Sequence, residues 1–437
     1  MWVVIILSVL SVQCVTAQFG DSPQASAYVE VRAGAHMFYW LFFTTAGVGH
    51  YTERPLVVWL QGGPGGSSTA VGNFEIMGPL DLELNERNYT WVKDFNVMYL
   101  DNPVGTGFSY VENNNLYTTS NEEIAEDFVN VMIGFYKNQP EFEGVPLYIF
   151  GQSYGGKMAI DMALKIHEAQ QENRIKSNIK GVAMGNAWIH PVDLTLTWAP
   201  LLLNAGLVTK EGHDDIMIQA RRAEQLFNQG QYSASTQAWS STQSAVFRAT
   251  SNVDFYNILS KMPRNTPDTR TDAERARDMM INDGYYPQKP SGKQVLSLEY
   301  IMNTLVKPKL DIPTNVYWGR QSGYVWDFLT GDFMKPVTES IERLLNETDI
   351  TVMKYNGNLD LICDTPGQLL WMERLKWSGA DEYKKSPRRP IWENGKLEGY
   401  YKSYRNLRFF WINVAGHSVP RDNPAGSRAF LRDMTGF

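Results

Sequence analysis

Short apolar runs recur along the chain, each bounded by glycine, proline or polar residues. They occupy residues 56–60, 97–100, 147–150, 179–184 and 350–355. Runs of this length without an alternating polar face are typical of strands that are buried on both sides of a sheet. Residues 27–45, rich in tyrosine, valine, phenylalanine and tryptophan, precede these runs and predict an N-terminal β-hairpin.

Helical patterns lie between the predicted strands. Ser120-Asn121-Glu122-Glu123 matches a capping box, in which the serine and the last glutamate cap a helix reciprocally. The apolar residues that follow share one helical stripe: Ile124, Phe128, Met132 and Phe135. Residues 155–171 form a second helical pattern directly after a predicted strand. Because strands and helices alternate, we expect an α/β fold whose mostly parallel sheet is covered by helices on both faces.

The alternation stops between residues 191 and 312. That stretch is polar, has helical patterns at 211–228 and 271–280, and contains no convincing strand. Strand patterns return at 350–355 and 409–414. We therefore predict a helical cap inserted into the core. The expected divisions are a signal peptide at 1–17, the first part of the core at 18–190, the cap at 191–312 and the second part of the core at 313–437.

Composition narrows the class of protein. The 437 residues, 43% of them hydrophobic, can bury a large core and argue against disorder. The formal net charge of −7 provides no basic surface of the kind that binds nucleic acid. The sequence leaves the oligomeric state open, with a homodimer among the options.

The chain begins with a segment that resembles a secretory signal peptide. An apolar run extends from Trp2 to Val12, and the small residues Val15-Thr16-Ala17 suit cleavage before Gln18. The alternative interpretation is a buried N-terminal strand. The run is too short to span a bilayer, so no membrane segment is expected once it is removed. We therefore expect a secreted or lysosomal protein.

Two features of the remaining chain bear on that compartment. Asn88-Tyr89-Thr90 and Asn346-Glu347-Thr348 match the acceptor sequence for N-glycosylation at Asn88 and Asn346. Cys14 leaves with the signal segment, so Cys363 has no cysteine in the mature chain with which to form a disulfide. We expect its thiol to serve as a small buried apolar group.

The segment Gly151-Gln152-Ser153-Tyr154-Gly155 follows an apolar strand and precedes a helix. A G-x-S-x-G sequence in this context is a nucleophile elbow, which exposes the serine hydroxyl on a tight turn. Glycine is required at 151 and 155 because backbone segments pass close to the serine. The N–H of Tyr154 lies at the helix N-terminus, where it can stabilise an oxyanion. This pattern predicts the α/β-hydrolase fold with Ser153 as the nucleophile.

A glycine-rich loop, residues 61–66, follows the strand predicted at 56–60. Hydrolases of this fold place the second oxyanion donor after that strand, and the Gly63 N–H is the candidate. The loop could instead bind phosphate, but it has neither the spacing nor the Lys-Ser/Thr ending of a phosphate-binding loop.

Asp360 and His417 each follow a predicted strand, and the order Ser153, Asp360, His417 is that of α/β-hydrolases. The imidazole is needed to remove the proton of the serine, and the carboxylate to orient the imidazole. The other histidines are interpreted as structural: His36, His50, His167, His190 and His213. No histidine or cysteine spacing suggests a metal site, and no cofactor is implied.

These residues resemble the serine carboxypeptidase family. The matching segments are WLQGGPGGSS at 59–68, DNPVGTGFSY at 101–110, GQSYGGK at 151–157, YNGNLD at 355–360 and AGHSVP at 415–420. They follow the family order over nearly the whole mature chain. The resemblance implies an exopeptidase that removes C-terminal residues from peptides or proteins, works at acidic pH and resides in lysosomes or the secretory route.

The resemblance also implies a site for the carboxylate at the end of the substrate. Gln61 stands at the family's amide position, and the N–H of Gly62 is expected to assist. The family usually adds two glutamates that share a proton at low pH. Here Gln152 replaces one, and Ile76 follows Glu75 where the second glutamate belongs. We hypothesise that Gln61, Gly62 and Gln152 still bind the carboxylate but without an acid switch, because a neutral amide donates at any pH.

Activity should then rise as His417 becomes neutral, near about pH 6–7, rather than peak near about pH 4–5. One alternative is that the loss of the glutamate pair turns the protein into an esterase, amidase or acyltransferase on the same triad. Another is a catalytically silent binding or protective protein, against which the retained Ser153, Asp360 and His417 argue. Reaction with a fluorophosphonate probe distinguishes the last alternative from the enzymes.

Overall fold

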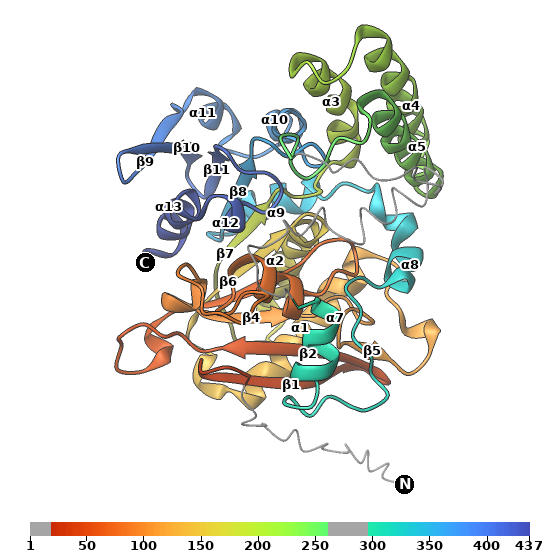
Figure 1. Ribbon diagram of the computed structural model, residues 1–437. Helices are drawn as coiled ribbons and strands as arrows, with labels where there is room; N and C mark the ends of the chain where they lie inside the picture. Colours follow the sequence, from red (N-terminus) through yellow and green to blue (C-terminus); the bar gives the residue numbers. More distant parts are fainter. Residues whose placement is uncertain (1–18, 261–295) are drawn as a thin grey trace.

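The computed structural model describes residues 19–260 and 296–437, and its centre is a twisted sheet (Figure 1). In spatial order the strands of its main path are β1 (Gln24–Arg32), β2 (Ala35–Phe42), β4 (Asn96–Leu100), β3 (Leu56–Leu60), β6 (Pro146–Gln152), β7 (Asn178–Gly185), β8 (Thr351–Gly357), β11 (Leu407–Ile412), β10 (Lys396–Tyr404) and β9 (Arg389–Glu393). A short strand, β5 (Tyr110–Val111), pairs with β2 outside this path. The strands from β4 to β11 are parallel, and both edges of the sheet are antiparallel.

The buried apolar runs are the central strands, as the sequence predicts. Every residue of β3 and β4 is buried, because helices cover both faces of the sheet. The N-terminal hairpin is also present, as β1 and β2. The hairpin of β9 and β10 was not predicted, because most of its residues are exposed or only half-buried and do not form an apolar run.

Helices pack on both faces of the sheet. One face carries α1 (Asn121–Asn138), α2 (Tyr154–Gln171) and α9 (Thr338–Glu347). The other carries the π-helix η2 (Ser68–Met77), with α12 (Val419–Asp422) and α13 (Pro424–Thr435). Short helices α10 (Thr365–Glu373) and α11 (Ala380–Lys385) lie between β8 and β9. The mostly parallel sheet with helices on both sides confirms the predicted fold class.

The start of α1 departs from the predicted capping box in one respect. The hydroxyl of Ser120 accepts a hydrogen bond from the N–H of Glu123, as expected. The carboxylate of Glu123 accepts from the N–H of Thr119 at 2.7 Å instead of from the N–H of Ser120. Ser120 is still the N-cap, and only the second bond of the box differs, because its donor is the residue before the N-cap.

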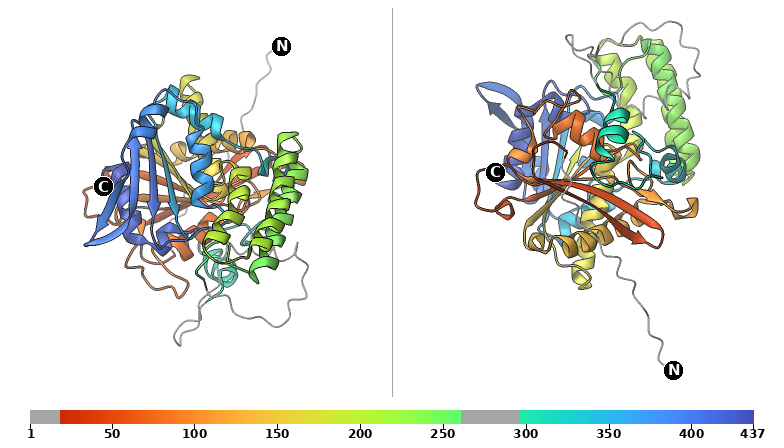
Figure 2. Two further views of the ribbon diagram at one scale, coloured as in Figure 1. Left: turned by 90° about the horizontal axis from the view of Figure 1, so that it is seen from above. Right: turned by 60° about the horizontal axis from the view of Figure 1, so that its bottom comes forward.

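Three long helices follow β7 and gather beyond one end of the sheet (Figures 1 and 2). They are α3 (Pro191–Asn204), α4 (Lys210–Asn228) and α5 (Tyr232–Thr250). After the gap come α7 (Leu298–Tyr300), the π-helix η6 (Ile301–Val306) and α8 (Gly323–Phe333). The helical pattern at 271–280 and the N-terminal segment 1–17 lie outside the described residues. In the described ranges, no helix has the length and apolar character needed to cross a membrane.

Candidate active site

Ser153 occupies a strained turn between β6 and α2. Its backbone φ is 61°, in the left-handed region that residues other than glycine seldom adopt. The turn is fixed from the neighbouring strand: the Ser153 N–H donates to the carbonyl of Gly185 at 3.0 Å, and the N–H of Trp188 donates to the Ser153 carbonyl at 3.0 Å. Tyr154 is the first residue of α2, so its N–H has no acceptor within the helix.

The two glycines of the elbow are required by close backbone contacts. A Cβ at position 151 would lie 2.1 Å from the carbonyl oxygen of Gly155. A Cβ at position 155 would lie 2.3 Å from the carbonyl oxygen of Leu60, at the end of β3. Such contacts cannot be relieved by a side-chain rotation, because both neighbours are backbone atoms.

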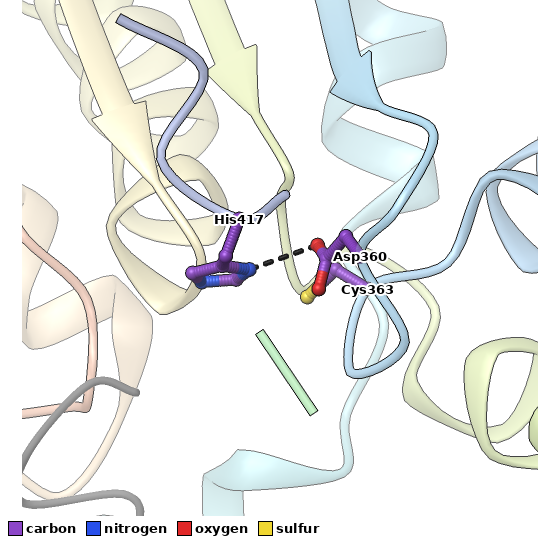
Figure 3. Close-up of side chains that lie close together, drawn as sticks. All are labelled: Asp360, Cys363 and His417. Carbon is purple, nitrogen blue, oxygen red and sulfur yellow. Dashed lines mark hydrogen bonds and ion pairs between the residues drawn. The ribbon is translucent and has the colours of Figure 1, made fainter. Parts of the chain in front are cut away.

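Asp360 and His417 form a buried hydrogen-bonded pair. Nδ1 of His417 lies 2.8 Å from Oδ2 of Asp360, and both side chains are almost completely excluded from solvent. Figure 3 shows the imidazole and the carboxylate pointing toward each other from the loops after β11 and β8. Parallel neighbouring strands place these loops together, since their carboxyl ends lie at the same edge of the sheet.

Asn186 also forms a hydrogen bond with Asp360, and this role was not predicted from the sequence. Its Nδ2 donates to Oδ2 of Asp360 at 2.7 Å, and its Oδ1 accepts from the N–H of Gly357 at 3.2 Å. The residue follows β7 directly, with a φ of 41°. A polar residue at the end of a buried strand was the available signal, but only the tertiary structure brings it to the loop of Asp360.

Tyr256, in the segment after α5, contacts His417 through both its backbone carbonyl and its ring. The N–H of His417 donates to the carbonyl of Tyr256 at 2.8 Å, and the two rings lie edge to face with centroids 4.9 Å apart. The same segment accepts hydrogen bonds from the N–H groups of Leu361 and Ile362 through the carbonyl of Phe255. The helical region after β7 therefore contacts the loops of both Asp360 and His417.

The glycine-rich loop approaches the nucleophile closely. A Cβ at Gly62 would lie 2.5 Å from the Cβ of Ser153 and 3.0 Å from its Oγ. Gly63, with a φ of 113°, lines the same cavity as Ser153 and Tyr154. The N–H of Gly66 donates to the carbonyl of Gly62 at 2.9 Å, which closes the loop into a tight turn. The two predicted oxyanion residues thus border one cavity with the nucleophile.

Aromatic side chains form the rest of this cavity. Its remaining lining residues are Trp188, Trp239, Tyr256, Phe333 and Ile362. Trp239, from α5, packs against Phe333, at the end of α8, with ring centroids 4.7 Å apart. Phe333 also stacks on Trp188 at 5.0 Å. The space beside Ser153 is therefore walled by flat apolar surfaces from three separate segments.

A buried ion pair ties that wall to the nucleophile helix. Nζ of Lys157, on α2, lies 2.8 Å from Oδ2 of Asp332, on α8, and the hydroxyl of Tyr154 donates to the same oxygen at 2.9 Å. Burial acts to raise the pKa of Asp332, but the charge and hydrogen bond of Lys157 and the hydroxyl of Tyr154 outweigh it, so the pKa is lowered. The pair fixes the residue before Phe333 to the first turn of α2.

The residues predicted to bind a substrate carboxylate are buried near the nucleophile. Oε1 of Gln61 accepts from the indole N–H of Trp59 at 3.2 Å, which turns its NH₂ group away from Trp59. Nε2 of Gln152 donates to Oγ of Ser418 at 3.1 Å. Gln152 precedes Ser153 and Ser418 follows His417, so this bond joins the nucleophile turn to the histidine loop.

Glu75 has a partner that the sequence did not reveal. Arg320 binds its carboxylate with two hydrogen bonds, Nη1 to Oε1 at 2.7 Å and Nη2 to Oε2 at 2.6 Å. The backbone of Arg320 accepts from the N–H of Ser67, next to the glycine-rich loop. Ile76 is buried. A bidentate guanidinium thus occupies both oxygens of the glutamate that the family motif retains.

A serine on a strained strand–helix turn, together with a buried carboxylate–imidazole pair on loops after later strands, is typical of serine hydrolases with the α/β-hydrolase fold. Within this class the assignment is narrower. The family model of the serine carboxypeptidases matches residues 16–436, and the chain belongs to this family of peptide hydrolases.

Similar proteins extend over nearly the whole chain. Retinoid-inducible serine carboxypeptidase of Rattus norvegicus is 41% identical over 93% of this chain and 90% of its own length. The human protein of that name is 39% identical over the same shares. Venom serine carboxypeptidase of Apis mellifera is 27% identical over 91% of this chain and 80% of its own.

A solved structure supports the fold. The crystal structure of Kex1Δp, a prohormone-processing carboxypeptidase from Saccharomyces cerevisiae, superposes with a TM-score of 0.79 at 21% identity. The superposition covers 95% of this chain and 91% of the Kex1Δp chain.

Proposed function

We propose that the chain hydrolyses the C-terminal peptide bond of peptides or proteins through an acyl-enzyme. In this mechanism Oγ of Ser153 attacks the last peptide carbonyl while Nε2 of His417 accepts its proton, and Asp360 holds the opposite ring nitrogen. The N–H groups of Gly63 and Tyr154 bind the oxyanion. His417 then protonates the leaving amine, and a water molecule that it deprotonates releases the acyl group.

The observation that carries this proposal is the 2.8 Å contact between His417 and Asp360, reinforced by Asn186. The imidazole nitrogen that faces the carboxylate must carry a proton, so the opposite nitrogen is the one that can accept a proton from a hydroxyl. That tautomer is the one a general base for Ser153 needs.

The substrate carboxylate would be bound by Gln61, the N–H of Gly62 and Gln152. Gln152 is neutral, and Glu75 is paired with Arg320, so no two carboxyl groups are left to share a proton. A site of this kind does not depend on acid to accept an anion. Activity should therefore follow the deprotonation of His417, without a requirement for a protonated glutamate.

The acyl part of the substrate would place its last side chain against the aromatic wall beside Ser153. Trp188, Trp239 and Phe333 offer flat apolar surfaces next to Ser153. We expect a preference for apolar residues immediately before the cleaved bond.

The protein is proposed to be secreted or lysosomal and glycosylated. Asn88 and Asn346 are both exposed. The Asn346 amide, however, accepts from the N–H of Ser378 at 2.9 Å and donates to the carbonyl of Lys376. Asn88 should therefore be modified more completely, and mass spectrometry of the chain expressed in a secretory host measures both occupancies.

The test of function is to sequence the products of a blocked peptide digested by the purified chain, with Ser153→Ala as the control. A ladder of peptides shortened from the C-terminus supports the carboxypeptidase. Cleavage of ester or simple amide substrates alone, with Ser153 labelled by a fluorophosphonate, would instead favour the alternative enzymes. An unlabelled, folded wild-type protein would leave only a binding role.

A further inference from the structure

Lys354 lies in the middle of β8 and is completely buried. Among the described residues it forms no ion pair with a carboxylate. In the adjoining parallel strands its register partners are Met184 and Phe409, neither of which carries a charge. A buried ammonium without a counter-ion is costly, so this position requires a physical explanation.

The amine is hydrogen-bonded toward the catalytic loop. Nζ donates to the carbonyl of Tyr355 at 3.0 Å and to Oδ1 of Asn356 at 2.7 Å. Nδ2 of Asn356 in turn donates to the carbonyl of Cys363 at 3.0 Å and to Oγ1 of Thr365 at 3.1 Å. Lys354 and Asn356 together therefore hold the loop in which Asp360 lies.

Three side chains meet at that loop: Asp360, Cys363 and His417 (Figure 3). A carboxylate oxygen of Asp360, Sγ of Cys363 and a ring nitrogen of His417 all lie within 4.8 Å of one another. Burial lowers the pKa of Lys354 to about 7, while Cys363 and Asp360 act to raise it. Burial raises the pKa of Asp364, which is also buried in this loop, while hydrogen bonds from Thr197 and the N–H of Gly367 act to lower it.

We propose that Lys354 is a positioning residue of the triad, whose ammonium acts through Asp360 to oppose the protonation of His417. This rests on the proposed roles of Ser153, Asp360 and His417. A nearby cation stabilises the pair of ionised Asp360 and neutral His417, which carries one net negative charge. It stabilises the pair less once His417 is protonated, because that pair has no net charge. His417 therefore keeps its lone pair at a lower pH than it would beside an apolar residue.

The consequence is that the enzyme keeps its catalytic activity at mildly acidic pH. It does so without a pair of glutamates that share a proton. Lys354 gains its charge in the same pH range in which an ordinary histidine becomes protonated. The two groups are coupled, so their protons bind in steps that belong to the cluster rather than to either residue.

The test measures the rate at which a fluorophosphonate labels Ser153 as a function of pH. This reaction reports on the basicity of His417 and needs no peptide recognition, so it is independent of the proposed carboxypeptidase specificity. In Lys354→Met the acid limb should move up by about 0.5–1 pH unit, whatever the change in the plateau rate. Lys396→Met, which removes an exposed lysine from β10, is the matched control and should leave the limb unchanged.

Lys354→Leu serves as a second variant should the methionine variant not fold. As an independent measurement, the imidazole of His417 can be titrated by NMR in the Ser153→Ala background, where its midpoint should rise in the same direction on loss of Lys354. An acid limb and a His417 midpoint that both stay in place in a folded variant overturn the proposal. Absence of labelling in the wild type contradicts the proposed function instead.

Discussion

The side-chain amide of Gln152 donates a hydrogen bond from Nε2 to Oγ of Ser418, 3.1 Å away. Oε1 of the same amide is buried and has no hydrogen-bond partner among the described residues. A hydroxyl can donate as well as accept, so the amide can also turn over, with Ser418 donating to Oε1 and Nε2 facing a substrate. Ser418 can therefore support the orientation that a carboxylate requires.

A carboxyl group at position 152, where the family usually has a glutamate, should make substrate binding depend on acidic pH. Gln152→Glu places a lone carboxylate near the end of the substrate, since Ile76 cannot share its proton. KM for a blocked dipeptide with a free carboxylate should rise about tenfold or more above about pH 6, where the glutamate is ionised. The same dipeptide as its methyl ester has no terminal charge and is the control, and its KM should change little.

The role of Ser418 is tested by removing and restoring its hydroxyl. In Ser418→Ala the turned-over amide leaves Oε1 buried without a donor, which costs about 1–3 kcal/mol. KM for the free-acid dipeptide should therefore rise about 5- to 150-fold. Ser418→Thr keeps the hydroxyl and should restore most of the affinity. Equal kinetics for the alanine and threonine variants would contradict this interpretation.

Asn186 should contribute to kcat by holding the carboxylate of Asp360. Asn186→Gly removes the amide and tolerates the positive φ at this position without strain. The lost hydrogen bond to a charged group is worth about 1.5–3 kcal/mol, so kcat should fall about 10- to 100-fold with little change in KM. Steady-state kinetics on one peptide substrate measure both constants. An effect confined to KM would assign Asn186 to substrate binding instead.

The packing of the nucleophile elbow can be tested by replacing two glycines with alanine, one inside the elbow and one outside it. In Gly155→Ala the new Cβ would lie 2.3 Å from the carbonyl oxygen of Leu60. Overpacking against backbone should reduce the free energy of unfolding by about 3 kcal/mol or more, and activity should fall with it. Gly144→Ala adds the same methyl group where no atom lies within 4 Å, so its denaturation curve should match the wild type.

Lys354 should also lower the stability of the fold at acidic pH. Its pKa is about 7 in the folded protein against 10.5 when solvated, so the unfolded chain binds more protons between these values. The unfolding free energy of the wild type therefore rises with pH in this window, and the penalty is complete below about pH 7. Lys354→Met should be more stable than the wild type, and this difference should shrink by about 3 kcal/mol between about pH 6 and pH 9. Urea denaturation of both proteins at the two pH values measures it, and a difference that does not vary with pH would contradict the buried charge.

Much of the fold could be predicted from local pattern. Strands such as β3 coincide with apolar runs, because a strand covered on both faces has no polar positions to obscure it. The hairpin of β9 and β10 escaped prediction because it lies at an exposed edge, where its residues do not need to be apolar. The second half of the capping box was wrong for a local reason, since the Glu123 carboxylate accepts from the N–H of Thr119 rather than from that of Ser120.

The sequence by itself identified Ser153, Asp360 and His417 as candidates. A nucleophile elbow and the end of a buried strand can each be recognised from a short stretch of consecutive residues. It could not reveal Asn186, Tyr256, the pairing of Glu75 with Arg320, or the bond between Gln152 and Ser418. Each of these contacts joins segments that are distant along the chain. Sequence determines the residues that each segment offers, whereas the order of strands in the sheet decides which of them meet, since hydrogen bonds and charges act only over the few ångströms that folding creates.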